Sequence, residues 1–319
     1  MRRPDRALRG PERASVEDID ALNRVFSESF TDRYARDGLI GVRVPHLNPL
    51  VWRYAIEDAA NGAMVWRDGE DEIAGFNMVH RSGSEGWMGP LAVRPDRQGQ
   101  HLGSQMVESG IEWLKQEGAT TVGLETMPRT VENIGFYSRL ALEPNHLTVT
   151  VVRDLASGKG APTERLGSAA IADEGAIAEC RSLVARLQTG VDFTRELALT
   201  HILGLGDTTL VRRNGRLAAL ALWHSVPLAA GRARDELRVL KLAAEDLDAF
   251  AELVRTLERV AQAERVRRLS IRAQTAFSDA YLHLIQCNFR VHWTDLRMTL
   301  HGFRERPPSD GVVMSNWEI

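Results

Sequence analysis

Residues 91–104, with the sequence LAVRPDRQGQHLGS, have the composition of a strand, a glycine-containing turn and the beginning of a helix. The apolar run Leu91, Ala92, Val93 ends at Pro95, and an apolar-periodic stretch begins at Leu102. A turn in this place can direct several backbone N–H groups at one point, and the helix N-terminus adds partial positive charge. It therefore suits a phosphate or pyrophosphate, although an ordinary strand-to-helix connection can have the same spacing. The candidate anion-binding residues are Gln98, Gly99, Gln100, His101, Leu102, Gly103 and Ser104.

The elements that position this turn follow from hydrophobic periodicity and turn residues. Ser15 is a candidate helix N-cap, and Asp68-Gly69 and the SGS segment at 82–84 separate three short strands. The expected helices are 14–29, 48–60, 101–117 and 130–140, and the expected strands are 63–66, 72–79, 87–93, 120–126 and 145–153. An antiparallel meander therefore leads into the turn.

Gly89-Pro90 falls inside the strand that precedes the turn. Proline cannot donate to the ladder and glycine weakens it, so we expect a bulge there, unless this is a plain edge proline. A bulged strand splays from its parallel neighbour and leaves backbone N–H and C=O groups without a partner strand. We expect these free groups to be those of Leu91 and Val93.

Val93-x-Pro95-x-x-Gln98-Gly99-x-His101-x-Gly103 resembles the coenzyme A loop of the GNAT superfamily of acyl-CoA-dependent N-acyltransferases, whose pattern is Arg/Gln-x-x-Gly-x-Gly/Ala. Gln98 and Gly103 match this pattern, while His101 replaces a glycine and must adopt the same dihedrals, including left-handed ones. The His101 side chain either donates to a phosphate oxygen or faces solvent. The resemblance implies that Leu91, Ala92 and Val93 bind the pantetheine arm and that the turn binds the pyrophosphate.

A second segment, from Glu125 to Leu142, is similar to the GNAT segment Leu-Glu-Val…Asn-x-x-Ala-x-x-Leu-Tyr-x-x-x-Gly-Phe. Thr130, Asn133 and Phe136 stand for the usual Asn, Ala and Leu, and Ala141-Leu142 stands for Gly-Phe. The resemblance adds Asn133 and Phe136 to the cofactor-binding residues. Tyr137 follows Glu125 by 12 residues, as in the ribosomal-protein N-terminal acetyltransferases of the superfamily, whose Glu and Tyr act as base and acid.

Acyl transfer to an amine explains the use of such a pair. An alkylammonium with a pKa of about 10 is not nucleophilic at neutral pH, so a carboxylate that removes its proton supplies the reactive amine. Tyr137 stays protonated and can donate to the departing sulfur, and a backbone N–H of the bulged strand can meet the oxyanion. Alternatively, Tyr137 only packs its ring, and Glu125 faces solvent or pairs with Arg129. His80 and Glu85 are alternative bases.

The second half of the chain repeats the pattern of elements weakly. The expected helices are 172–187, 193–204, 245–262 and one that ends near 286, and the expected strands are 208–211, 216–223, 237–242, 269–273 and 291–300. Aligning Asn288-Phe289 with Ala141-Leu142 places Leu284 at the Tyr137 position and Arg272 at the Glu125 position. The loop equivalent, residues 243–249, carries three carboxylates and no glycine, which opposes phosphate binding. We expect a degenerate copy that either walls the acceptor cleft of the first or only stabilises it.

Length and composition set the remaining bounds. A chain of 319 residues with 44% hydrophobic and 26% charged residues predicts a soluble protein of two domains. A net charge of -3 gives no general attraction to nucleic acid or anionic membrane, and the two cysteines have no metal or redox spacing. Neither a secretory signal nor a membrane span is expected, so we expect a cytoplasmic protein.

The sequence therefore predicts an α/β (α+β) protein with two GNAT-like domains, each a mixed, mostly antiparallel twisted sheet flanked by helices. Residues 1–154 form the coenzyme A-binding, catalytic domain, 155–164 a linker, 165–302 the degenerate domain and 303–319 a tail that is loose or docks along an edge. The expected function is transfer of an acetyl group from acetyl-CoA, without a metal, to a primary amine on a small molecule or a peptide N-terminus. A non-catalytic acetyl-CoA sensor or scaffold and an interaction module without cofactor are the alternatives. The sequence leaves the acceptor and the oligomeric state open.

Overall fold

The computed structural model describes residues 8–156, 163–167 and 174–316. The elements of the first half are β1 (Arg9–Arg13), α1 (Ile19–Arg36), α2 (Pro49–Ala59), β2 (Ala63–Arg67), β3 (Ile73–Ser82), β4 (Glu85–Val93), the 3-10 turn η3 (Pro95–Arg97), α3 (Leu102–Gln116), β5 (Thr121–Thr126), α4 (Val131–Arg139) and β6 (Leu142–Asp154). Those of the second half are α6 (Glu174–Leu187), α7 (Thr194–Ile202), β7 (Gly206–Arg213), β8 (Arg216–His224), β9 (Glu236–Ala244), α8 (Leu247–Ala263), β10 (Arg268–Gln274), α9 (Ser278–Gln286), β11 (Arg290–Leu300) and β12 (Val312–Ser315).

The strands of the described residues form one mixed sheet in the order β1-β2-β3-β4-β5-β11-β6-β10-β9-β8-β7, with β12 paired to β9. The pairs β4–β5 and β10–β9 are parallel, and the other neighbours are antiparallel. Each half therefore has a mostly antiparallel sheet with one parallel pair, as the sequence predicts.

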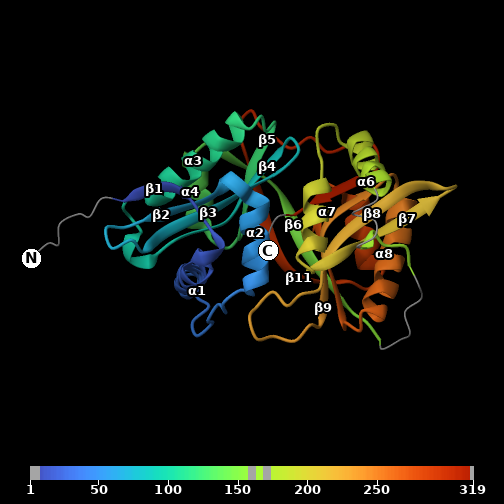
Figure 1. Ribbon diagram of the computed structural model, residues 1–319, viewed down its shortest axis with the longest axis horizontal. Helices are drawn as coiled ribbons and strands as arrows, with labels where there is room; N and C mark the ends of the chain where they lie inside the picture. Colours follow the sequence, from blue (N-terminus) through green and yellow to red (C-terminus); the bar gives the residue numbers. More distant parts are fainter. Residues whose placement is uncertain (1–7, 157–162, 168–173, 317–319) are drawn as a thin grey trace, which may run out of the picture.

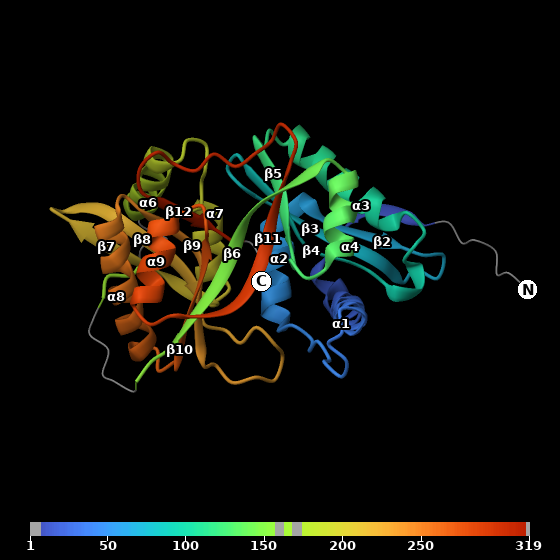
Figure 2. The same ribbon diagram turned by 180° about the vertical axis from the view of Figure 1, so that it is seen from behind.

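Helices cover both faces of this sheet in each half (Figures 1 and 2). In the first half, α1 and α2 pack on one face around Trp52 and Phe76, and α3 and α4 pack on the other around Met106 and Leu142. In the second half, α6 and α7 cover one face, and α8 and α9 cover the other. The apolar periodicity of the helices accounts for these layers, because each helix buries one stripe against the sheet.

The last strands of the two halves are exchanged. β11, from the second half, pairs with β5 and lies between β5 and β6, whereas β6, from the first half, pairs with β10. These two long strands cross the middle of the molecule in Figure 2. The boundary expected at 155–164 thus divides the chain but not the sheet. Residues 157–162 of that expected linker lie outside the described residues, as do the first two residues of the helix expected at 172–187.

Local chemistry explains several element boundaries. The Asn48 side chain caps α2 by accepting from the N–H of Leu50 at 3.0 Å, and Ser15 and Asp18 form a capping box one turn before α1, so the helix expected from residue 14 begins as a 3-10 turn. Ala141 and Asn288 both follow a helix and have φ of 62° and 63°, so the two positions that the internal repeat aligns share a left-handed backbone.

The tail does not hang free where the structure describes it. β12 pairs antiparallel with β9 over Val312–Ser315 and is buried. Of the two outcomes expected for the tail, docking along a strand edge is the one observed.

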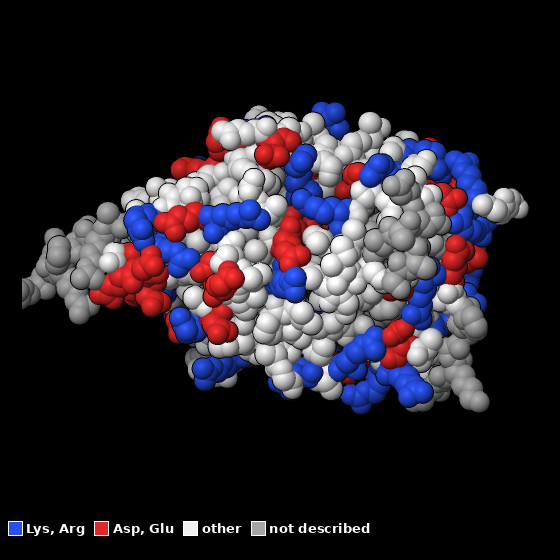
Figure 3. All heavy atoms as spheres, in the orientation of Figure 1, with Lys and Arg blue, Asp and Glu red and all other residues white. Residues whose placement is uncertain are grey.

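Positive and negative side chains alternate over the face of the molecule in Figure 3. Many charged side chains of the described residues are paired, for example Arg212 with Glu164 and Arg53 with Glu57. That face has no uniformly basic surface of the kind that attracts polyanions. Among the described helices, none combines the length and the apolar character that a bilayer-crossing segment needs.

Candidate active site

The strand β4 separates from β5 halfway along its length. The two strands pair from Glu85 with Thr121 to Met88 with Leu124, and the register of β4 against β3 shifts between Met88 and Leu91. The irregularity falls at Gly89-Pro90, where the sequence predicts a bulge. Beyond it, the N–H of Arg94 donates to the carbonyl of Ala74 at 2.8 Å. In the antiparallel alternation Leu91 and Val93 therefore direct their backbone groups away from β3, toward the open side.

The turn that follows β4 is fixed by ion pairs beneath it. One carboxylate oxygen of Asp68 accepts from Arg94 and from Arg97, each at 2.7 Å, and the other accepts from the N–H of Glu70 at 3.0 Å. Burial alone would raise the pKa of Asp68, but these hydrogen bonds hold it well below its usual range. The carboxylate therefore stays charged and keeps the 3-10 turn η3 in place.

The backbone of the turn takes the left-handed conformation at two positions. Gly99 has φ 74° and His101 has φ 63°, so the histidine does adopt dihedrals that glycine normally supplies. Gly99, Gln100 and His101 are exposed, whereas the side chain of Leu102, the first residue of α3, is buried in the core of the first half. At Leu102 only the backbone N–H can therefore face an anion.

A cleft, here called the outer cleft, runs beside this turn and encloses about 810 Å³ including its open mouth. It is lined by Leu91, Ala92, Val93, Gln98, Gly103, Asn133 and Phe136 of the predicted cofactor-binding residues. The carbonyl of Val93 already accepts from Ser29 at 3.0 Å and from Gln98 at 3.1 Å, so both of its lone pairs are used. Leu91 is the better placed of the two residues to pair with a ligand backbone.

A second space, the inner cavity, lies between β4, β5, α1 and the second half, and encloses about 1100 Å³ including its mouth. Its wall is largely aromatic and aliphatic, and two carboxylates, Glu125 and Asp295, face it. The apolar lining residues include Phe26, Phe30, Tyr34, Val44, Leu47, Met88, Met127, Leu228 and Trp293.

Tyr137 lines both the outer cleft and the inner cavity, together with Leu91 and Asn133. Its side chain is buried, and burial raises the pKa of the phenol above its ordinary value. The phenol is therefore a proton donor at neutral pH, and it lies where the two spaces meet.

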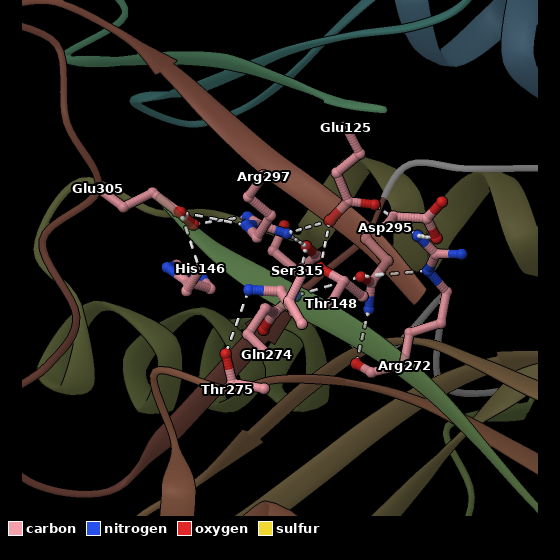
Figure 4. A network of polar contacts seen from close by, with 12 residues as sticks. Glu125, His146, Thr148, Arg272, Gln274, Thr275, Asp295, Arg297, Glu305 and Ser315 are labelled. Atoms are coloured by element: carbon pink, nitrogen blue, oxygen red, sulfur yellow. Dashed lines mark hydrogen bonds and ion pairs between the residues drawn. The ribbon is translucent and has the colours of Figure 1, made fainter. Parts of the chain in front are cut away.

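Glu125 is held by two guanidinium groups (Figure 4). Arg297 donates to one carboxylate oxygen at 2.8 Å, Arg272 forms a short ion pair with the other, and Thr148 also donates. Burial alone would raise the pKa of Glu125, but the charges of Arg272 and Arg297 outweigh it and hold the pKa below its ordinary value. The carboxylate is thus fixed and ionised, and it is a weak proton acceptor.

The other candidate bases lie elsewhere among the described residues. His80 is buried, and its Nδ1 is 2.8 Å from Asp58. Glu85 lies at the start of β4 and accepts from Gln188 at 3.0 Å, and burial raises its pKa. Neither is among the residues that line the outer cleft or the inner cavity. The alternative partner of Glu125, Arg129, instead donates to the carbonyl of Asp37 at 2.7 Å.

Several residues of the site carry no sequence signal. Leu228, Trp293 and Asp295 come from the second half, and their place in the cavity depends on the exchanged strand β11 and on the bridge between Leu47 and Ala229. Arg33 and Arg36 of α1 line the outer cleft. Arg272 is visible in the sequence as the counterpart of Glu125 in the repeat, but its ion pair with Glu125 itself is not. No group of His, Cys, Asp and Glu within the described residues is arranged to hold a metal ion.

The site lies within a segment that matches a known family. Residues 20–141 match the sequence model of the acetyltransferase (GNAT) family. The matched segment contains the glycine-containing turn, Glu125 and Tyr137. No curated protein sequence matches the chain significantly.

Solved structures with the same fold extend over both halves. A putative acetyltransferase from Pyrococcus horikoshii is 12% identical, with a TM-score of 0.68, and the match covers 100% of this chain and 96% of that one. A tandem GNAT protein from the clavulanic acid biosynthesis pathway is 13% identical over 92% of this chain and 98% of that one, with a TM-score of 0.60. Saccharomyces cerevisiae N-myristoyltransferase with bound myristoyl-CoA is 9% identical over 96% of this chain and 80% of that one, with a TM-score of 0.64. At these identities the likeness establishes the fold, and it confirms the predicted fold class.

Proposed function

We propose that the chain is an N-acetyltransferase that moves the acetyl group of acetyl-CoA to a primary amine, with the GNAT domain of the first half as the catalytic unit. The observation that carries the proposal is the position of Tyr137 at the junction of two spaces, one beside the glycine-containing turn and one lined by apolar side chains and carboxylates. A thioester delivered from the first space and an amine delivered from the second would meet beside a buried phenol.

The outer cleft is assigned to coenzyme A. The N–H groups of the turn from Gln98 to Ser104 and the N-terminus of α3 bind the pyrophosphate, and the free backbone edge at Leu91 pairs with pantetheine. Arg36 of α1 is half-exposed at the cleft and pairs with Asp32, also of the lining, at 2.8 Å, so it could exchange that partner for a phosphate. The N–H of Leu91 is also available to the oxyanion that develops on the thioester carbonyl.

The reaction balances with groups of this chain. The amine nitrogen forms a bond to the carbonyl carbon, and the carbon–sulfur bond breaks. Tyr137 donates its proton to the departing sulfur, and the proton lost by the amine passes through water to solvent, from which the phenol is reprotonated. Because the pKa of Glu125 is lowered, we assign this carboxylate to attracting and orienting the acceptor ammonium, with water as the immediate proton acceptor.

The inner cavity favours an acceptor with an apolar body and a primary amine. Its aromatic and aliphatic wall would bury the body, and Glu125 and Asp295 would face the ammonium. A strongly anionic or highly hydroxylated acceptor would leave that wall without contacts and its own polar groups without partners.

The test combines binding and turnover. Acetyl-CoA at about 100 times its Kd should stabilise the protein by about 2.7 kcal/mol, which a thermal-shift assay detects. Coenzyme A release should then be measured against a series of primary amines, from ethanolamine to alkyl and arylalkyl amines, with the apolar amines expected to give the highest kcat/KM.

A Tyr137→Phe variant should lose roughly 100-fold in kcat while its acetyl-CoA Kd stays unchanged. Tyr281→Phe, in α9 and away from both spaces, is the matched control and should turn over normally. Unchanged turnover in Tyr137→Phe would remove the phenol from the reaction. Tight acetyl-CoA binding without transfer to any amine would instead favour the non-catalytic sensor.

A further inference from the structure

The strand β9 pairs with β10 over only part of its length and then separates from it, as β4 separates from β5. β9 pairs in parallel with β10 only from Glu236 to Val239, just as β4 pairs with β5 only as far as Met88. β4 and β9 can be aligned residue by residue beyond this point. At the end of β4 the N–H of Arg94 donates to the carbonyl of Ala74, and at the end of β9 the N–H of Glu245 donates to the carbonyl of Ala218 at 3.0 Å. Leu242 and Ala244 therefore correspond to Leu91 and Val93.

β12 occupies the slot that this splay opens. Met314 pairs with Leu242 and Val312 pairs with Ala244, so the backbone groups at the positions that in β4 point away from β3 are paired in β9 by the C-terminal strand β12. The second half thus holds a segment of protein in the place that, in the first half, we assign to pantetheine.

The end of β12 reaches the ion pairs of the inner cavity. The carbonyl of Ser315 accepts from Arg297 at 3.3 Å and from Gln274 at 3.1 Å (Figure 4). Asn316, 2% exposed, follows directly, and its Oδ1 accepts from Gln274 at 3.1 Å and from Nε of Arg272 at 3.5 Å. Its Nδ2 donates to the carbonyl of Arg272 at 3.2 Å, and its own N–H donates to Leu240 at 2.9 Å.

We propose that β12 acts as an internal ligand of the second half and that Asn316 is a positioning residue for the acceptor site. It orients Arg272, while the Ser315 carbonyl orients Arg297, and these two guanidinium groups fix the Glu125 carboxylate. The consequence for catalysis rests on the proposed function, whereas the positioning itself does not.

The physical reason is that a buried carboxylate needs its partners held in place. Glu125 has a side chain only 1% exposed, and the side chains of Arg297 and Arg272 are 1% and 13% exposed. A guanidinium that loses its second-side hydrogen bonds gains rotamer freedom, and the ion pair it makes weakens. Weakening either ion pair would raise the pKa of Glu125 and leave its carboxylate free to take several positions.

The experiment uses the full chain with Asn316→Ala, and Met314→Ala as the matched control. Met314 is buried in the same strand and packs in the core of the second half, without a contact to the ion pairs among its described interactions. Asn316→Ala should raise the acceptor KM roughly tenfold and leave the acetyl-CoA KM unchanged, whereas Met314→Ala should lower Tm and leave both KM values unchanged.

A second measurement does not depend on activity. The pKa of Glu125 is lower in the folded protein than in the unfolded chain. Its ion pairs therefore stabilise the fold at pH values above the ordinary carboxyl pKa, and this stabilisation is lost as the pH falls through the folded-state pKa. The Tm difference between the wild type and Asn316→Ala should therefore be largest at pH 7 and shrink toward pH 4. In the Glu125→Gln background the change with pH should be smaller, and what remains of it belongs to Asp295, which also pairs with Arg272 at 3.1 Å.

These readouts separate the two proposals. Absence of acetyl-CoA binding would defeat the proposed function, while the pH-dependent Tm cycle would still decide the role of Asn316. The positioning role is overturned if the Tm difference is the same at pH 4 and pH 7, or if Asn316→Ala and Met314→Ala change the KM values alike. If the alanine variant does not fold, Asn316→Asp keeps the shape and shares Arg272 with a new charge, so it too should raise the acceptor KM. A wild-type acceptor KM in that variant would equally overturn the proposal.

Discussion

Gly103 offers a test in which stability and ligand binding should change in opposite directions. It is the second residue of α3, and a Cβ added there would lie 3.5 Å from Phe136 Cζ and 3.8 Å from Val93 Cγ2. These are ordinary contacts, so alanine fits without strain. Because alanine restricts the unfolded chain and favours helix, Gly103→Ala should stabilise the free protein by about 0.5 kcal/mol.

The same methyl group would project into the outer cleft between two of its lining residues, Val93 and Phe136. If the turn binds a pyrophosphate, the methyl group holds the phosphate away from the backbone N–H groups at the start of α3. Losing one charge-assisted hydrogen bond costs about 1.5–3 kcal/mol, which corresponds to a roughly 10- to 100-fold higher Kd for acetyl-CoA.

Thermal unfolding of the free protein and calorimetric titration with acetyl-CoA measure the two effects separately. Gly135→Ala is the matched control, because Gly135 of α4 is not among the residues that line the outer cleft, and its Cβ would meet only Arg139 Nη1 of the same helix at 3.7 Å. It should stabilise similarly and leave the Kd unchanged. A Gly103→Ala protein that is folded and binds acetyl-CoA as the wild type does would refute the assignment of the turn to the pyrophosphate.

Three further outcomes follow from the geometry. Asp68→Asn removes the charge that Arg94 and Arg97 share and leaves one acceptor oxygen for the guanidinium groups and the backbone N–H of Glu70. The acetyl-CoA KM should therefore rise and the free energy of unfolding should fall by about 1–3 kcal/mol, checked by kinetics and urea titration. Trp293→Ala should raise the acceptor KM and leave the acetyl-CoA KM unchanged, because Trp293 lines only the inner cavity of the two; equal changes in both would contradict this. Burial raises the pKa of Tyr137, so ionisation of the phenol should not lower kcat up to about pH 10. If kcat falls below that pH in the wild type but not in Tyr137→Phe, the phenol is not a buried acid with a raised pKa.

Much of the fold was predictable because it depends on local periodicity. The amphipathic helices α3 and α8, the meander from β2 to β4 and the bulge at Gly89-Pro90 all follow from neighbouring residues. The fold class is confirmed by the structural neighbours as well as by the sheet. The roles of the site residues and the domain boundaries stay predictions.

The exchange of β6 and β11 was not predicted, and docking of the tail was one of two expected outcomes, without β9 as its partner. These pairings join strands that are far apart in the chain, and the residues of a strand do not by themselves indicate which other strand it pairs with. The same limit applies to the site. Glu125 and Tyr137 were visible through their spacing, whereas the pairing of Glu125 with Arg272 and Arg297, and the wall formed by Trp293 and Asp295, depend on the exchanged strand.

The crossing of β6 and β11 also constrains how this protein can evolve. Removing the second half would take away β11, the strand between β5 and β6, so selection is expected to keep that half for its strand whether or not it does any chemistry. Mutations in the second half are then selected also by their effect on the first half. Neither half can be lost or exchanged alone, because each is completed by a strand of the other, and the two are inherited as one unit.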